Sequence, residues 1–166
     1  MNRRKRATRP LWLLFIALAC SAQLPGAFSK SLPMSLREQV TSADVICLCR
    51  TEAGSTNGSF DKDRGQEVIV DVSVLETLKG EAPAVIRVRT SPTTSVSAHL
   101  KVSSVNFLIL QLHGSTYDLF NGERSAVEVD DSGIVYTCFI ADQPTTQPSA
   151  AFASAIRRLV QKRASR

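Results

Sequence analysis

The feature that most restricts the fold of this chain is a series of short apolar segments that alternate in polarity and are separated by turn signals. Alternation with a period of two is typical of strands, and Asn121-Gly122 and Asp131-Ser132-Gly133 are strong turn sequences. Six or seven short strands with a helix at each end predict a mainly β protein, a small five- to seven-stranded barrel or sandwich. The predicted strands cover residues 44–51, 67–78, 84–90, 105–112, 117–120, 126–129 and 134–140.

The first predicted strand is apolar on both faces. Val45, Cys47 and Cys49 fall on one face, and Ile46 and Leu48 fall on the other. A strand that presents apolar side chains to both sides is typical of a central position covered on both faces. We therefore expect this strand to lie at the centre of the sheet.

Two amphipathic helices are predicted to flank the strands. Pro33 suits the first position of a helix, where its missing N–H leaves no hydrogen bond unmade. Apolar positions of this short helix are Met34, Leu36, Val40 and Ala43. Ser149 is expected to cap a second helix over residues 149–163. Its apolar stripe consists of Phe152, Ile156, Leu159 and Val160.

The first nineteen residues predict an export signal. A basic head precedes an apolar run over residues 11–19, and Ala17-Leu18-Ala19 resembles a cleavage signature. The run has about half the length that a helix needs to cross a bilayer, so a cleaved signal is favoured over a permanent anchor. We expect cleavage between about residues 19 and 30, a single domain over residues 31–166, and a secreted or periplasmic protein.

The charge balance argues against nucleic-acid binding. The formal net charge is +5, and five cations lie before residue 10. The rest of the chain holds fifteen basic and fifteen acidic residues, so it lacks the excess positive charge of a nucleic-acid-binding domain. The last ten residues contain a second group of five basic residues. They either contact a membrane surface or, as we favour, complement the C-terminus of the last helix.

Three short motifs follow one another over residues 42–112. Ser42-Ala43-Asp44-Val45-Ile46 begins a strand, Leu78-Lys79-Gly80 ends a long one, and Val88-Arg89-Thr90-Ser91-Pro92-Thr93-Thr94-Ser95-Val96 precedes a hydrophobic strand. This series resembles the N-terminal domain of the tissue inhibitors of metalloproteinases and, more broadly, the netrin-like module. The resemblance implies a five-stranded oligonucleotide/oligosaccharide-binding (OB) barrel with flanking helices. Those inhibitors begin with a zinc-chelating Cys-X-Cys, whereas Cys20 is followed by Ser21 and Ala22, so protease inhibition is not carried over.

Three cysteines belong to the predicted domain, and export to an oxidising compartment favours disulfides. Cys47 and Cys49 share one face of a strand, and an undistorted strand does not easily let them bond to each other. A disulfide from Cys47 or Cys49 to Cys138 is the simplest pairing. A redox-active Cys-Leu-Cys pair is the alternative, which we disfavour because apolar neighbours raise the pKa of a thiol.

Cys20 permits a second interpretation of the N-terminus. Ala17-Leu18-Ala19-Cys20 resembles a bacterial lipobox, in which the cysteine is lipidated and becomes the mature N-terminus. A lipid anchor on Cys20 is therefore the alternative to simple cleavage, and it is the one membrane anchor that we consider.

No pattern in the sequence predicts a catalytic, metal or cofactor site. There is no Gly-X-Ser-X-Gly elbow, and neither His99 nor His113 has a partner at ligand spacing. Asp130-Asp131 before Ser132-Gly133 could bind a cation, but a turn between two short strands has the same composition, and we favour the turn.

Two polar segments, residues 52–66 and 91–104, are predicted to be exposed loops that form a recognition edge. We therefore expect an exported, monomeric, non-catalytic domain that binds a protein or a polysaccharide. The alternative is an envelope-associated hydrolase or thiol-redox enzyme whose site is assembled only by folding. The candidate binding residues are Asn57, Phe60, Lys62, Arg64, Thr93, Thr94, Ser95 and His99.

Overall fold

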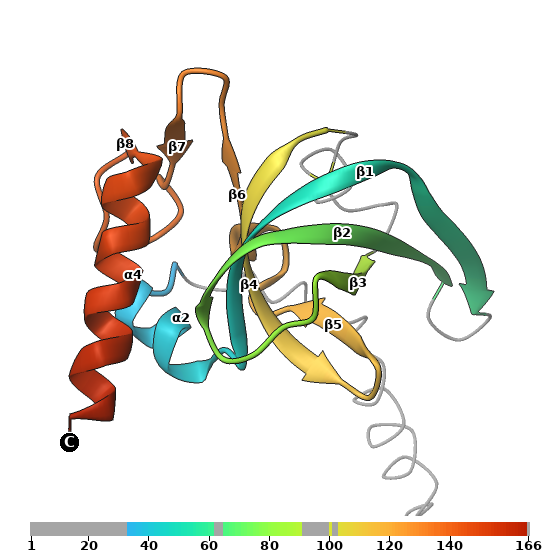
Figure 1. The fold of residues 1–166 in the computed structure, drawn as a ribbon, viewed down its shortest axis with the longest axis horizontal. Coiled ribbons are helices and arrows are strands. Elements are labelled where there is room, and N and C mark those ends of the chain that lie inside the picture. The colour runs from blue at the N-terminus through green and yellow to red at the C-terminus, as the bar shows by residue number, and fades with distance from the viewer. Residues whose placement is uncertain (1–32, 62–64, 91–99, 101–102, 166) are drawn as a thin grey trace, which may run out of the picture. The chain divides into compact units, whose positions relative to one another are not determined.

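The computed structural model describes residues 33–61, 65–90, 100 and 103–165 (Figure 1). The predicted signal and Cys20 lie outside these residues. Within the described ranges, no helix has the length and apolar character needed to cross a membrane. The elements are α2 (Leu36–Ser42), β1 (Val45–Asp61), β2 (Gly65–Lys79), β3 (Val85–Thr90), β4 (Val105–His113), β5 (Thr116–Leu119), η1 (Gly122–Ser125), β6 (Ala126–Val129), β7 (Ile134–Tyr136), β8 (Thr146–Pro148) and α4 (Ser149–Ala164).

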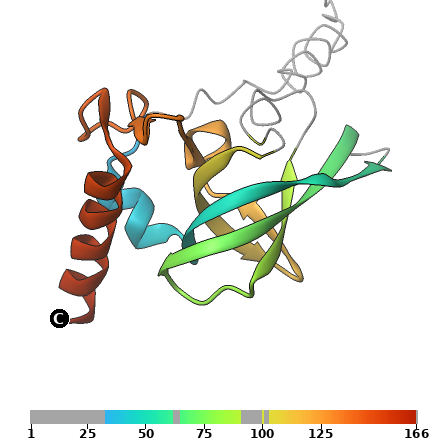
Figure 2. The same cartoon turned by 45° about the horizontal axis from the view of Figure 1, so that its top comes forward.

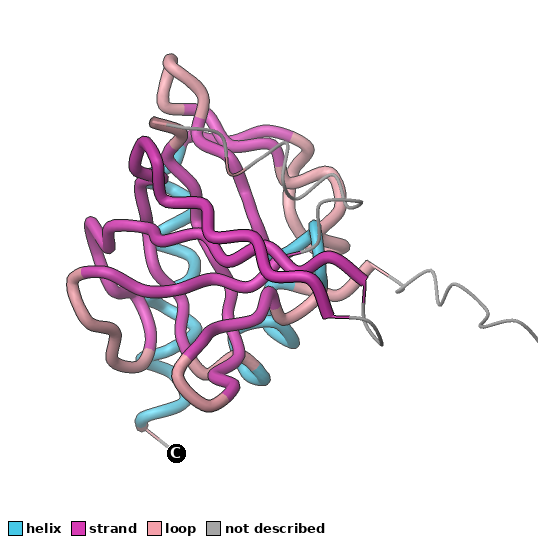
Figure 3. Tube along the Cα trace, turned by 90° about the vertical axis from the view of Figure 1, so that its right-hand side faces the viewer, coloured by secondary structure: helices cyan, strands magenta, loops and turns pink. Residues whose placement is uncertain are grey.

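Five strands close into a barrel. Figure 3 shows the strands of the domain in magenta. The strand order is β1-β2-β3-β5-β4, and β4 pairs back with β1. All of these pairs are antiparallel except β3 with β5, which meet at only two positions, Val88 opposite Tyr117 and Arg89 opposite Asp118. The result is a small OB-like barrel with a helix before and after it, which confirms the predicted fold class.

Alternate residues of the barrel strands fill its interior. Val45, Cys47 and Cys49 of β1 point inward, while Ile46 on the other face of β1 is fully buried against the helical side. The predicted central position of this strand is therefore confirmed. The buried residues of the interior are Val45, Cys47, Cys49, Val70, Val72, Ile86, Val88, Leu100, Leu108, Leu110, Tyr117 and Ala126.

A second apolar cluster joins the two helices to the outside of the barrel. Leu36 and Val40 of α2 and Phe152 and Ile156 of α4 contribute to it, and Phe107 of β4 meets them from the barrel. Figures 1 and 2 show both helices on the same side of the barrel. The predicted apolar stripe of the C-terminal helix is confirmed, and it faces this cluster.

The start of α2 and the cap of α4 differ from the prediction. α2 starts at Leu36 instead of Pro33, because Ser35 Oγ accepts from the Glu38 N–H at 3.2 Å and the Glu38 carboxylate accepts from the Ser35 N–H at 2.8 Å. This reciprocal capping box satisfies backbone groups that Pro33 could not. In α4, Ser149 is the first helical residue and its side chain does not cap the helix, so its predicted role is wrong. Its N–H instead donates to the carbonyl of Gly133.

The largest departure concerns residues 52–66, which were predicted to be a loop. β1 instead continues to Asp61, and its residues 56–61 pair in register with residues 65–70 of β2. We call these two paired segments the ribbon. A composition rich in Gly, Ser and Asn indicates that a segment has no apolar face to bury. Backbone pairing between strands does not require an apolar face, and the prediction of a loop was wrong for that reason.

The strands near the C-terminus also differ from the prediction. β7 ends at Tyr136, because the Thr137 N–H donates to the carbonyl of Thr145 and the Ile140 N–H donates back to Thr137 in a turn. The predicted strand over residues 134–140 was therefore too long. β8, which pairs with β7, lies in a Pro- and Thr-rich segment outside the predicted strands.

Candidate functional site

Arg89 of β3 and Asp118 of β5 form a bidentate ion pair on the outer surface of the barrel. Val88 and Thr90 are buried, so Arg89 between them points away from the barrel interior. Its Nε and one terminal nitrogen donate to the two carboxylate oxygens of Asp118, at 2.7 and 2.5 Å. Bidentate geometry makes this one of the stronger kinds of polar contact. The pair spans the short parallel junction of β3 and β5, where the barrel closes.

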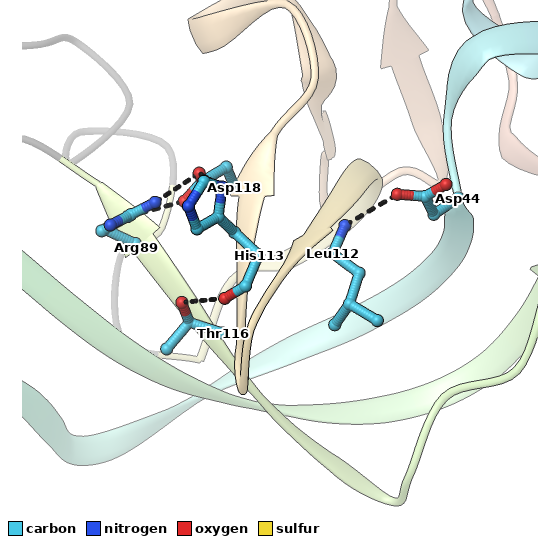
Figure 4. A network of polar contacts seen from close by, with 6 residues as sticks. All are labelled: Asp44, Arg89, Leu112, His113, Thr116 and Asp118. Carbon is cyan, nitrogen blue, oxygen red and sulfur yellow. Dashed lines mark hydrogen bonds and ion pairs between the residues drawn. The ribbon is translucent and has the colours of Figure 1, made fainter.

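His113 lies beside this ion pair at the end of β4 (Figure 4). Its Nδ1 is 3.8 Å from Asp118 Oδ2, and 69% of its side chain is exposed. The Thr116 hydroxyl donates to the backbone carbonyl of His113 at 3.1 Å. Sequence reasoning found no partner for His113, because the spacing of His113 and Asp118 is typical of neither a metal site nor a triad. The fold nevertheless presents an accessible imidazole next to a paired carboxylate.

A second, looser ion pair lies on the same surface. Asp71 of β2 stands opposite Arg87 of β3, and the Arg87 Nε is 3.8 Å from a carboxylate oxygen of Asp71. We call the set Asp71, Arg87, Arg89, His113 and Asp118 the charged face. The alternation of β3 already placed both arginines on one side in the sequence, but their acidic partners come from other strands. Sequence analysis therefore missed this face.

The ribbon is continuous with the charged face through β2. Ile69 pairs with Asn57 of the ribbon on one side and with Arg89 of the charged face on the other. β1 pairs with β4 only from Val45 to Arg50, so in the described part of the chain residues 56–61 pair with β2 alone. Figure 1 shows the ribbon extending away from α4. With respect to the described residues, its outer edge is open to pairing with another strand.

The two predicted recognition segments adjoin at Thr51, where β1 leaves the barrel. The Thr51 N–H donates to the Ser104 carbonyl at 3.0 Å, and the Ser103 N–H donates to the Thr51 carbonyl at 2.8 Å. The end of segment 91–104 therefore lies at the base of the ribbon. The start of segment 52–66 and the end of segment 91–104 therefore lie at the same end of the barrel.

The predicted binding residues fall into two groups. Asn57 and Phe60 are part of the ribbon, opposite Ile69 and Gln66. The others lie outside the described residues: Lys62, Arg64, Thr93, Thr94, Ser95 and His99.

The three cysteines of the domain are free thiols in the structure, and no bridge joins Cys47 or Cys49 to Cys138. Cys47 and Cys49 are buried in the barrel interior, whereas Cys138 is exposed and lies beyond the end of β7. The strand environment predicted for Cys138 is therefore wrong. The Cys49 thiol donates to Cys47 Sγ at 3.2 Å, and this contact together with burial raises the pKa of Cys49 well above its ordinary value. A neutral, buried thiol is a poor redox nucleophile.

A basic pocket of about 200 Å³ lies between α2 and α4. Arg163, one of its lining residues, donates to the Thr41 carbonyl at 2.8 Å, and the Lys79 ammonium donates to the carbonyls of Val40 and Ala43. Burial, and next the charge of Arg163, lower the pKa of Lys79. These cations meet the carbonyl end of α2, where the helix dipole favours positive charge. Their role here is to hold α2 against α4 and β2.

An acidic pocket of about 340 Å³ lies near the turn between β6 and β7, with Asp130 and Asp131 in its wall. Asp130 Oδ1 accepts from the N–H groups of Ser132 and Ile134 at 2.9 and 2.8 Å, so this carboxylate closes the turn. Across the residues that the structure describes, no group of three or more His, Cys, Asp or Glu side chains could hold a metal ion.

A comparison with models of known protein families and with curated proteins found no match to this chain.

Proposed function

We propose that this chain is an exported, non-catalytic binding domain of the netrin-like type that binds a partner protein with the ribbon and the charged face. The observation that carries the proposal is the one-sided pairing of residues 56–61 of β1 with β2. A strand with an open edge can pair with an extended segment of another protein, whose main chain then supplies the hydrogen bonds.

The position of the charged face supports the same proposal. OB-like barrels commonly bind ligands on the outer face of their second and third strands and at the connections that flank it. Arg87 and Arg89 lie on β3, the ribbon forms the connection from β1 to β2, and His113 stands at the connection from β4 to β5. Charges of both signs next to a strand edge would orient the partner and select its register.

The chemistry of the described residues favours binding over the alternative enzyme functions. Asp118, the acidic neighbour of His113, already accepts hydrogen bonds from two guanidinium nitrogens of Arg89 on its two carboxylate oxygens. Cys47 and Cys49 are buried, so a substrate disulfide has no access to them in the folded barrel.

Site-specific cross-linking tests the proposal. A photoreactive amino acid replaces Asn57 in the ribbon, and the matched control carries it at Asp131 on the turn between β6 and β7. After irradiation of exporting cells, we expect one discrete protease-sensitive adduct at position 57 and none at position 131. An adduct that resists protease and is degraded by glycan-cleaving enzymes identifies a polysaccharide partner instead. Equal labelling at both positions, or none at position 57, contradicts the proposal.

A shortened ribbon separates binding from folding. Deleting residues 59–61 and 65–67 removes three residues from each strand and keeps the pairing of Val68 with Thr90. Because the deletion leaves residues 68–70 and their pairing with β3 in place, we expect the free energy of unfolding to change by no more than about 1 kcal/mol. With the photoreactive residue kept at position 57, this variant should form less adduct than the unshortened chain, because half of the open strand edge is removed. An undiminished adduct in a stably folded variant contradicts a binding role for the deleted half of the ribbon.

A further inference from the structure

Cys47 and Cys49 lie where β1 is curved by irregular pairing with β2. Opposite each of the steps Ile46–Cys47 and Leu48–Cys49, β2 contains one additional residue, Leu78 and Leu75. Against β4 the register of β1 is continuous. Extra residues on one strand bend and twist the pair locally, so β1 and β2 coil tightly around the barrel at this point.

This curvature brings the two thiols together. In a flat strand, residues two apart are separated by about 6.6 Å, and their side chains stand parallel. Cys47 and Cys49 point into the concave interior of the barrel, where side chains converge, and their sulfurs are 3.2 Å apart. A disulfide bond has a length of about 2.05 Å, so only a small further approach separates this contact from a bond.

We propose that Cys47 and Cys49 form a disulfide with each other in the oxidised protein, and that Cys138 stays a free thiol. The pairing differs from the long-range bridge expected from the sequence. Cys138 is exposed in the turn that follows β7, whereas Cys47 and Cys49 belong to the cluster inside the barrel. A bridge to Cys138 would require one of these side chains to leave the interior.

The bond forms by thiol–disulfide exchange with a small disulfide such as oxidised glutathione. One cysteine thiolate attacks the glutathione disulfide, which releases one glutathione and leaves a mixed disulfide. The second cysteine thiolate attacks the protein sulfur of the mixed disulfide and releases the second glutathione. The cysteine pair loses two electrons and two protons, and the two departing glutathione molecules gain them. Because both thiols are buried after folding, exchange takes place before β1 is enclosed.

Peptide mapping of the full chain tests the pairing. The unmutated protein is refolded from urea in a glutathione buffer, alkylated without reductant and digested with trypsin. Cys47 and Cys49 share the peptide of residues 38–50, Cys138 lies in residues 125–157, and Cys20 lies in a peptide that ends at Lys30. We expect peptide 38–50 to be unalkylated and lighter by two hydrogens, and peptide 125–157 to be alkylated.

Three results would overturn the proposal. They are alkylation of both cysteines in peptide 38–50, a cross-link between this peptide and residues 125–157, and a cross-link between it and the peptide of Cys20. Cys138→Ser is the matched control and should leave the internal loop of peptide 38–50 unchanged. Cys49→Ser should abolish it, and the map of the unmutated chain decides the question even if this variant does not fold.

A redox equilibrium tests whether the fold itself favours the bond. At one fixed ratio of oxidised to reduced glutathione, the fraction of looped peptide 38–50 should be higher after refolding than in urea. Once formed and enclosed, the bond should also resist reductant in native buffer and be reduced in urea. An equal or lower oxidised fraction after refolding would show that the barrel does not bring the sulfurs together.

Discussion

The rings of Phe107 and Phe152 meet edge to face, with their centroids 5.1 Å apart and their planes at 80°. Phe107 belongs to β4, and Phe152 belongs to the first turns of α4, so this contact joins the C-terminal helix to the outside of the barrel. An ion pair between Arg157 of α4 and Glu76 of β2 lies further along the helix. The aromatic contact is buried, whereas both side chains of the ion pair are well exposed.

Phe152→Ala should therefore be strongly destabilising. Loss of a fully buried ring leaves a cavity between α4 and β4, and we expect a loss of about 4 kcal/mol in the free energy of unfolding. Tyr136→Ala is the control, because this ring is 54% exposed and should cost less than about 1 kcal/mol. Urea denaturation of both variants gives the comparison. Similar losses would mean that α4 does not depend on this contact.

Gly80→Ala should also destabilise the protein. Gly80 has φ +73°, and a Cβ there would overlap the backbone carbonyl oxygen of Asp44, where β1 begins. We expect a loss of more than about 2 kcal/mol from left-handed backbone strain and displacement of this carbonyl.

Gly114→Ala separates these two causes. Gly114 has φ +63°, but a Cβ there meets nothing within 4 Å. The backbone strain alone should cost about 1 kcal/mol. Thermal or chemical unfolding that gave equal losses for both variants would show that the contact with Asp44 is unimportant.

Arg89→Met tests the ion pair that spans β3 and β5. The side chains of Arg89 and Asp118 are only 21% and 32% exposed, so removing one partner should cost about 2 kcal/mol. Arg87→Met removes a looser pair with more exposed side chains and should cost less than about 0.5 kcal/mol. Asp118→Leu added to Arg89→Met should recover part of the loss, because it removes the unpaired carboxylate. Equal effects of the two single substitutions would contradict a special role for the closure of the barrel.

The capping box of α2 should make stability depend on pH at the acid end. Hydrogen bonds from Ser35 hold the pKa of Glu38 below its ordinary value of 4.5. A carboxyl whose pKa is lower in the folded state stabilises the protein above its unfolded pKa, and this contribution is lost as pH falls through the folded pKa. Glu38→Gln keeps a neutral hydrogen-bonding group, so it should melt below the unmutated protein at neutral pH. The difference should vanish in acid, and a constant difference across melts at several pH values would contradict this assignment.

Much of the fold could be read from local patterns. Along β2 and β3 the apolar residues Val70, Val72, Ile86 and Val88 alternate with the residues of the opposite face, and they point into the interior because a strand must bury one face to be stable. The apolar stripe of α4 was visible for the same reason. The ribbon was missed because backbone pairing of residues 56–61 with residues 65–70 defines it, and backbone pairing leaves no periodic trace in composition.

The candidate site depended on the closed barrel. Arg87 and Arg89 were visible as neighbours on one face of a strand, but Asp118 reaches Arg89 only because β3 and β5 pair in parallel across 29 residues of chain. His113, by contrast, has its acidic neighbour across the antiparallel hairpin of β4 and β5, close by in sequence. Contacts between residues far apart in sequence follow from strand order, and local propensity carries no information about that order.

Cys47 and Cys49 show most clearly which properties follow from the sequence and which follow from the tertiary structure. The sequence by itself determined that Cys47 and Cys49 lie on the same face of one strand, because side chains two residues apart in a strand point to the same side. Only the tertiary structure decided their distance, since the two extra residues of β2 curve the pair around the barrel and bring the sulfurs to 3.2 Å. Side-chain direction is a local property of a strand, whereas curvature is imposed by the strands that pair with it.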